Sequence, residues 1–140
     1  MNLEVTLAGK TFKNPVTTAS GTFGSGAEYE QFVDLAALGA VTTKGVANVP
    51  WEGNPTPRVA ETYGGMLNAV GLQNPGVERV ISEELPRLAR CFHKPVMANV
   101  SGFSAAEYAE VCEKLDAQEQ VGWLEVNISC PNVHGGGAAF

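Results

Sequence analysis

Four short apolar runs alternate with longer, more polar stretches along the chain. The runs are Val16–Ala19, Ala40–Thr43, Val96–Val100 and Trp123–Ile128. They are rich in β-branched residues and too short for helices, which is typical of strands buried on both faces of a sheet. The pattern therefore predicts four buried strands.

Helical patterns lie between these predicted strands. In Ala27–Leu38, apolar side chains recur on one helical face. Pro75–Ala89 also has a helical pattern, in which Pro86 predicts a kink or a break. Ser104 and Glu107 form a capping-box pattern ahead of apolar residues at helical spacing. Three helical segments are therefore expected.

The alternation of strand and helix predicts parallel βαβ units with right-handed crossovers, and hence an α/β fold. Two segments lie outside this alternation. The opening Leu3–Phe12, with Gly9 midway, predicts a small hairpin. The segment Ala47–Asn74 is rich in proline and glycine and is too long for an ordinary connection, so it predicts a functional loop.

Composition narrows the class of protein. The 140 residues are 44% hydrophobic and 17% charged, with a net charge of −6, which fits a globular protein and disfavours a nucleic-acid surface. The apolar runs are far shorter than the roughly 18 residues of a membrane span, and the first residues lack the layout of a signal peptide. Three cysteines without a CxxC pattern favour a reducing compartment. A soluble, cytoplasmic protein is expected.

Polar or small residues stand where each predicted strand ends. They are Ser20, Lys44, Asn99, Asn127 and Cys130. In open α/β sheets and in (β/α)₈ barrels, ligands bind at the carboxyl ends of parallel strands. Connecting loops are commonly polar for other reasons, but four strands that deliver such residues to one edge predict a convergent polar site.

Cys130 is the candidate proton acceptor of this site. It leaves a predicted strand for a glycine-rich loop, and such a loop can close over a ligand. Cys91 and Cys112 are instead expected to be buried and inert. Cys91 with His93, and Cys130 with His134, lack the spacing of a zinc site, so no metal is expected.

Lys44 and the amides of Asn68–Asn74 suggest the kind of ligand. An ammonium group after a buried strand needs an anionic partner, which can be a ligand carboxylate, an electron-rich cofactor ring or a structural salt bridge. Amides both donate and accept hydrogen bonds, which suits a planar, imide-like ring. The stretch Gly21–Gly26 matches neither the dinucleotide-binding nor the P-loop glycine pattern.

Several longer motifs occur in a fixed order along the chain. They are Asn14-Pro15-Val16, Ala19-Ser20-Gly21, Thr43-Lys44-Gly45, Asn54 to Arg58, Asn68 to Gly76, Ala98-Asn99-Val100 and Asn127 to Asn132. Together they resemble the N-terminal part of the class 1 dihydroorotate dehydrogenases, flavin enzymes of pyrimidine synthesis. The run from Asn127 to Val133, followed by glycines and Ala139-Phe140, resembles the class 1B type.

This resemblance implies a fold, a reaction and a set of site residues. The fold would be a (β/α)₈ TIM barrel, of which residues 1–140 cover the first four βα units and an N-terminal hairpin. The reaction would be oxidation of dihydroorotate to orotate, with Cys130 as the base and FMN as the hydride acceptor. FMN would contact Ser20, Lys44, Gly45, Asn99 and Asn127. The substrate would contact Lys44, Asn68, Ala69, Val70, Gly71, Leu72, Asn127 and Asn132.

The resemblance also implies a partner and leaves alternatives open. A class 1B enzyme pairs with an iron–sulfur subunit that carries FAD, in a heterotetramer that passes electrons to NAD. The alternatives are a class 1A enzyme linked to fumarate, a dihydropyrimidine dehydrogenase-like enzyme and a non-catalytic half-barrel. Because such a barrel needs about 250 residues, a polypeptide that ends at Phe140 is expected to bind FMN poorly and to be inactive.

Overall fold

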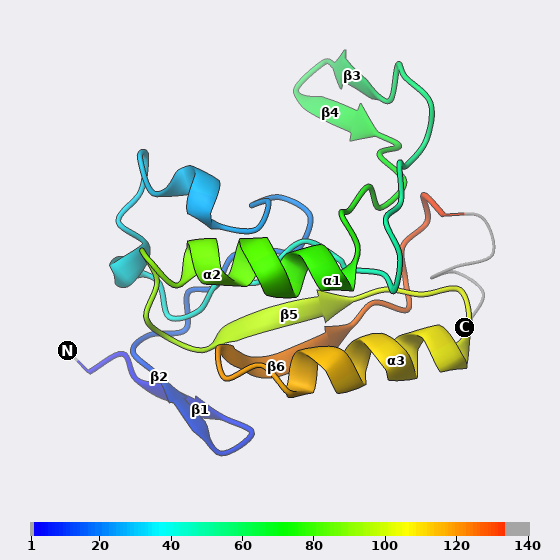
Figure 1. The fold of residues 1–140 in the computed structure, drawn as a ribbon. Helices are drawn as coiled ribbons and strands as arrows, with labels where there is room; N and C mark the ends of the chain where they lie inside the picture. Colours follow the sequence, from blue (N-terminus) through cyan, green and yellow to red (C-terminus); the bar gives the residue numbers. More distant parts are fainter. Residues whose placement is uncertain (1, 134–140) are drawn as a thin grey trace.

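A parallel sheet lies at the centre of the computed structural model, which describes residues 2–133 (Figure 1). Its regular part is β5 (Val96–Val100) paired with β6 (Val121–Val126). A register shift between Val96 and Met97 marks an irregularity near the start of the pair. β5 matches the third predicted strand, whereas β6 begins and ends two residues before the fourth, which was predicted at Trp123–Ile128.

The first two predicted strands lie beside β5 in chain order. Parallel bridges join Thr17 to Ala40 and Thr42 to Met97. Between the first two segments a side chain takes the place of a backbone partner: the Thr42 backbone N–H donates to Thr18 Oγ1 at 2.8 Å. The predicted parallel order of the four chain segments is therefore confirmed, with helical connections before β5 and before β6, while the predicted continuous strands at Val16–Ala19 and Ala40–Thr43 are not formed.

Two helical segments pack on this sheet. The first is one continuous stretch made of α1 (Val77–Arg79), a π-helical turn (Val80–Glu84) and α2 (Leu85–Leu88). Of the predicted kink or break at Pro86, the break is absent, and the stretch is instead irregular at the π turn directly before α2. Pro86 has no N–H to donate to the preceding turn, and the wider π turn directly before α2 accommodates this residue without ending the helix.

The second helix, α3 (Ala105–Asp116), begins at the predicted cap. Ser104 Oγ accepts a hydrogen bond from the Glu107 backbone N–H at 3.3 Å. The Glu107 carboxylate accepts one from the Phe103 N–H at 2.6 Å, one residue before the position that a capping box uses. The sequence therefore placed the start of α3 correctly.

The predicted helix Ala27–Leu38 was wrong. Two short 3₁₀ turns, Ala27–Tyr29 and Leu35–Ala37, occupy this segment. Asp34 starts the second turn by accepting a hydrogen bond from the Ala36 N–H at 3.0 Å. Phe32, which should have faced the core, is 76% exposed. The segment buries Ala27 and Leu35 and leaves the predicted face exposed at Phe32, so a helix with that face inward would gain little from packing.

Two antiparallel hairpins extend from the sheet and helices (Figure 1). The predicted N-terminal hairpin is formed by β1 (Val5–Leu7) and β2 (Lys10–Phe12), and the Phe12 ring stacks on Trp123 of β6 at 4.3 Å between centroids. The second hairpin lies inside the predicted functional loop and was not predicted. Its strands are β3 (Val59–Thr62) and β4 (Gly65–Asn68).

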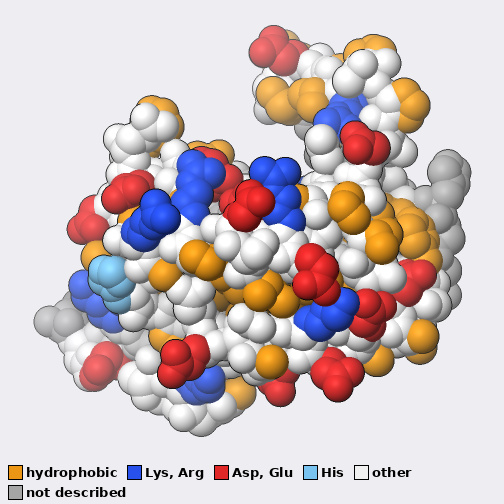
Figure 2. Space-filling view, viewed as in Figure 1, with side chains coloured by type: hydrophobic (Ala, Val, Ile, Leu, Met, Phe, Trp, Pro, Cys, Tyr) orange, Lys and Arg blue, Asp and Glu red, His pale blue; other side chains and the backbone are white. Residues whose placement is uncertain are grey.

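All residues of β3 and β4 are exposed, and Figure 2 shows apolar side chains gathered on this projecting hairpin. The main core lies instead between the sheet and the helices. Its fully buried side chains include Val41, Val46, Val77, Leu88, Val100, Val111 and Leu115. Among residues 2–133, no helix is long and apolar enough to span a bilayer.

Candidate active site

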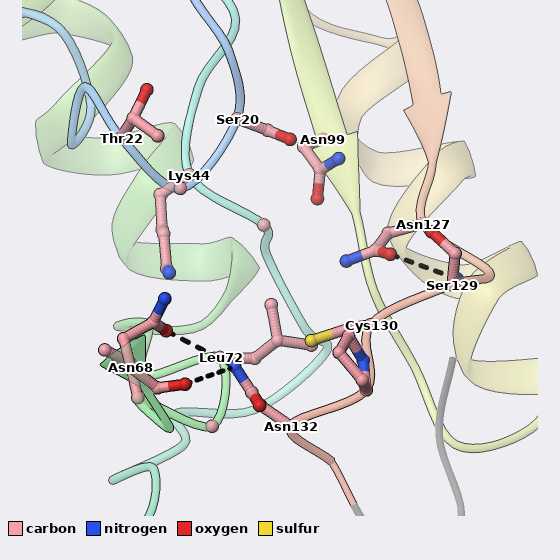
Figure 3. A pocket seen from close by; sticks show the side chains of 15 residues that line it. Ser20, Thr22, Lys44, Asn68, Leu72, Asn99, Asn127, Ser129, Cys130 and Asn132 are labelled. Carbon is pink, nitrogen blue, oxygen red and sulfur yellow. Dashed lines mark hydrogen bonds between the residues drawn. The ribbon is translucent and has the colours of Figure 1, made fainter. Parts of the chain in front are cut away.

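A cavity of about 470 Å³ opens where the parallel segments end. It combines residues from the two loops after the first two segments, from β5, from the end of β4 and from the stretch that follows β6 (Figure 3). Its lining consists of Ser20, Gly21, Thr22, Lys44, Gly45, Asn68, Val70, Gly71, Leu72, Asn99, Asn127, Ser129, Cys130, Pro131 and Asn132. The predicted convergence of strand ends on one site is therefore observed.

Asn99, on β5, is 2% exposed and forms the back of the cavity. Its Nδ2 donates to Glu125 Oε1 at 2.6 Å. Its Oδ1 is buried and accepts no hydrogen bond from any residue between 2 and 133. A buried acceptor without a donor is costly, so this oxygen is suited to a ligand that carries an N–H or O–H group.

Gly45 makes room beside that oxygen. A Cβ atom at Gly45 would lie 2.6 Å from Asn99 Oδ1 and 2.9 Å from Ser101 Oγ, which are both closer than van der Waals contact allows. Only glycine therefore fits here without movement of the Asn99 and Ser101 side chains. The absence of a Cβ atom lets these two side chains lie close to the Gly45 backbone.

We expect Gly45→Ala to weaken binding of a planar cofactor and to destabilise the fold by about 1–3 kcal/mol, because the added methyl group overpacks this corner. Titration of the cofactor and a thermal unfolding curve measure the two effects. Gly64→Ala in the β3–β4 turn is not a matched control, because Gly64 has a φ of +77°. Gly65→Ala is a better one, since the nearest atom to its Cβ would be Thr62 Oγ1 at 3.4 Å.

Lys44 extends its ammonium group along one side of the cavity (Figure 3). Partial burial lowers its pKa below 10.5; Arg58 lowers the pKa further, and a negative charge at Cys130 opposes the shift. None of the salt bridges among residues 2–133 involves Lys44. An anionic ligand would therefore stabilise the charged ammonium group.

Asn127 follows β6 directly and is held by its neighbours. Its N–H donates to the Val100 carbonyl at 2.9 Å, and its own carbonyl accepts from the Tyr108 hydroxyl at 2.5 Å. Its Oδ1 accepts from the Ser129 N–H at 3.4 Å. Burial raises the pKa of Tyr108, so its hydroxyl remains a donor at neutral pH. Helix α3 thus fixes the point at which the Cys130 loop begins.

The loop that carries Cys130 is tied to the β3–β4 hairpin. Asn132 Nδ2 donates to both the carbonyl and the Oδ1 of Asn68 at 3.3 Å, and Asn54 Nδ2 donates to the Asn132 carbonyl at 3.2 Å. Figure 3 shows the Cys130 sulfur directed toward the Leu72 side chain. The thiol is free and lines the cavity.

The turn at Gly71 and Leu72 shapes the opposite wall. Both residues have positive φ values, 75° and 54°, and a Cβ at Gly71 would lie 2.8 Å from Asn54. Left-handed backbone is unfavourable for leucine, so neighbouring contacts must hold it. Asn74 does so: its Nδ2 donates to the Leu72 carbonyl at 2.8 Å, while its Oδ1 accepts from the Ala47 N–H at 3.1 Å.

The predicted site residues lie together with one exception. Ala69 does not line the cavity, because its N–H donates to the Arg58 carbonyl and its carbonyl accepts from Asn54. Four lining residues were not predicted: Gly21, Thr22, Ser129 and Pro131. Each lies within two residues of a predicted residue, and this proximity was the available signal. His134, the glycines at 135–137 and the motif ending at Phe140 lie outside the described residues.

The other two cysteines lie outside this cavity. Cys91 and Cys112 are partly buried, and burial raises the pKa of both thiols. Within residues 2–133, no three histidine, cysteine or acidic side chains are grouped so that they could hold a metal ion.

A cavity at the carboxyl ends of parallel strands is typical of an α/β enzyme. Here that cavity is lined by several amides, one thiol and one ammonium group. Comparison with known proteins makes the assignment specific. The family model described as "Dihydroorotate dehydrogenase" matches residues 2–140. The chain belongs to this family.

Proteins from several bacteria are similar to this chain over its whole length. It is 64% identical over 140 residues to a protein of Lachnoclostridium phytofermentans and 56% identical over 140 residues to one of Alkaliphilus metalliredigens. Both are named "Dihydroorotate dehydrogenase B (NAD(+)), catalytic subunit". Each alignment covers 100% of this chain and 46% of the relative, so the chain spans about half the length of these relatives.

A solved structure supports the fold. The crystal structure of the DHODH of Eimeria tenella in complex with ferulenol matches with a TM-score of 0.76 at 23% identity. The match covers 96% of this chain and 38% of that one. The described segments therefore adopt the α/β arrangement found in that enzyme.

Proposed function

We propose that this chain forms the N-terminal part of a flavin-dependent dehydrogenase that oxidises dihydroorotate to orotate in de novo pyrimidine synthesis. The observation that carries the proposal is the convergence of Cys130, Lys44 and several asparagines on one cavity. In the proposed complete protein, residues 1–140 supply the first half of a (β/α)₈ barrel domain. The names and lengths of the bacterial relatives support this assignment.

The residues at the back of the cavity fit FMN. The unpaired acceptor of Asn99, which lies close to the Gly45 backbone, suits a planar ring with an N–H donor. We assign Ser20, Lys44, Gly45, Asn99 and Asn127 to this cofactor. When bound, FMN supplies a hydride acceptor, which the protein's own side chains lack.

Cys130 acts as the general base in this proposal. Its thiolate removes the proton from C5 of dihydroorotate while a hydride leaves C6, so that the C5–C6 bond becomes a double bond and the substrate loses two electrons. The loop that follows β6 brings the thiol into the cavity, and the bonds from Asn132 to Asn68 support that loop.

The remaining cavity residues bind the substrate. The Lys44 ammonium group pairs with the substrate carboxylate and stabilises negative charge that develops during the reaction. The amides of Asn68, Asn127 and Asn132, with the backbone from Val70 to Leu72, hydrogen-bond the imide edge of the pyrimidine ring. Ala69 contributes at most indirectly, through its position between Asn68 and Val70.

We further propose that the complete protein is cytoplasmic and passes its electrons to NAD. It would do so through a partner subunit that carries FAD and an iron–sulfur cluster, in a heterotetramer. The name shared by the bacterial relatives, with "NAD(+)" and "catalytic subunit", supports this choice over fumarate as the acceptor.

Turnover of two substrates tests the reaction. The complete catalytic subunit should oxidise dihydroorotate and should fail to oxidise dihydrouracil, because only dihydroorotate offers a carboxylate to Lys44. Orotate formation is followed by absorbance, with an artificial dye as the electron acceptor. Equal rates on the two substrates, or an absence of flavin in the purified protein, would contradict the proposal. NAD reduction after co-purification with an iron–sulfur protein tests the partner.

A further inference from the structure

Glu125 lies beside Asn99 in the sheet. The two residues are register partners on β5 and β6, and Asn99 Nδ2 donates to Glu125 Oε1 at 2.6 Å. The contact is partly buried, and Asn99 itself is 2% exposed. Glu125 does not line the cavity and was not among the predicted site residues.

The carboxylate determines how the Asn99 amide is oriented. An ionised carboxylate has acceptors and no donor, so only the NH₂ end of the amide can face it. The amide oxygen must then point the other way, toward Gly45 and Ser101. Figure 3 shows the Asn99 oxygen directed into the cavity. No other side chain in residues 2–133 hydrogen-bonds this amide group.

The cost of this arrangement points to a ligand. The Asn99 oxygen is buried without a donor, whereas a rotated amide would offer its NH₂ group to the cavity instead. Glu125 therefore keeps the amide in an orientation that is unsatisfied among the described residues. Such an orientation becomes favourable once a ligand donates a hydrogen bond to the oxygen.

We propose that Glu125 is a positioning residue for the cofactor site: it holds the Asn99 amide so that an acceptor oxygen, and not a donor, faces the cavity. The site then selects a planar ring with an imide N–H, as FMN has, over a ring that offers only acceptors at that edge. This inference rests on the proposed function, because it takes FMN as the ligand of Asn99.

The proposal is tested in the complete subunit by exchanging the amide of Asn99 and the carboxylate of Glu125 between the two positions. FMN is titrated into flavin-free protein for the wild type, Glu125→Gln, Asn99→Asp and the double variant. Glu125→Gln lets the Asn99 amide adopt either orientation and should weaken FMN binding about three- to tenfold. Asn99→Asp places two carboxylates in contact and should weaken binding by more than about tenfold.

The double variant should recover most of the affinity that Asn99→Asp loses. In it, the amide introduced on β6 donates to the carboxylate introduced on β5, whose second oxygen again faces the cavity as an acceptor. The total charge equals that of the wild type. A residue that only fills space would not give this reciprocal rescue. Glu113→Gln on the exposed side of α3 is the matched control and should leave FMN affinity unchanged.

The outcomes are distinct. Recovery in the double variant, with similar thermal unfolding midpoints for all variants, supports the proposal. Additive losses in the double variant, or unchanged FMN affinity in Glu125→Gln, would overturn it and leave the proposed function intact. A wild-type subunit that binds no FMN would contradict the proposed function itself, and with it the ligand assigned here to Asn99.

Discussion

Cys130→Ala should reduce dihydroorotate oxidation by the complete subunit about 10²- to 10⁴-fold, which is the usual effect of losing a general base. The loss should appear in kcat, because alanine removes the proton acceptor while the amides that bind the ring remain. The FMN content should stay near one per subunit, since Cys130 is not among the assigned cofactor contacts and alanine leaves the Asn127 side chain in place. Single-turnover flavin reduction measures the chemical step directly.

Cys112→Ala is the matched control for this experiment. Cys112 is a partly buried thiol on α3 that packs against the core, so its removal should cost some stability and leave the rate nearly unchanged. A Cys130→Ala enzyme with wild-type kcat would assign the base to another group. Equal losses in both variants would point to a general loss of folded protein, which a thermal unfolding curve detects.

Lys44→Met should lower kcat/KM for dihydroorotate about 10²- to 10³-fold. Methionine fills a similar volume but supplies no charge for the substrate carboxylate or for negative charge that develops in the reaction. Lys44→Arg should not restore the rate, because the planar guanidinium group cannot replace a compact ammonium group in this confined position. Steady-state kinetics with dihydroorotate measure both variants.

The pH dependence of orotate binding provides a second test of Lys44. Burial lowers the pKa of Lys44 below 10.5, so the folded protein loses this charge at a lower pH than an exposed lysine does. Orotate affinity should therefore decline as the pH rises, beginning below 10.5, and Lys44→Met should lack this decline. An alkaline decline that is unchanged in Lys44→Met would assign it to another group.

Much of the fold could be predicted because buried strands leave a clear pattern of apolar residues in the sequence. The apolar runs that became β5 and β6 are buried or partly buried along most of their lengths, and Ser104 marks the start of α3. The prediction was wrong for Ala27–Leu38, where the apolar spacing suits a helix but Phe32 faces solvent. The β3–β4 hairpin was missed because its residues are exposed and pack on little else.

The candidate site was predictable for a different reason. Parallel strands bring their carboxyl ends together, so a polar residue after each strand is enough to predict that these residues meet. What sequence could not provide was the pairing of side chains across strands. The contact between Asn99 and Glu125 depends on the register of β5 with β6, and the exclusion of Ala69 depends on hydrogen bonds made by Arg58 and Asn54.

The chain has two tryptophans, and each is an intrinsic fluorescent probe near one end of the sheet. Trp123 stacks on Phe12 near the start of β6, and Trp51 packs against Phe103 just beyond the end of β5, beside the Cys130 loop. Emission from Trp51 should therefore change when the neighbouring Asn132 segment moves, whereas emission from Trp123 should change when the N-terminal hairpin is released. Replacing one indole at a time with phenylalanine would give two single-tryptophan variants, in which ligand binding and release of the hairpin could be followed separately.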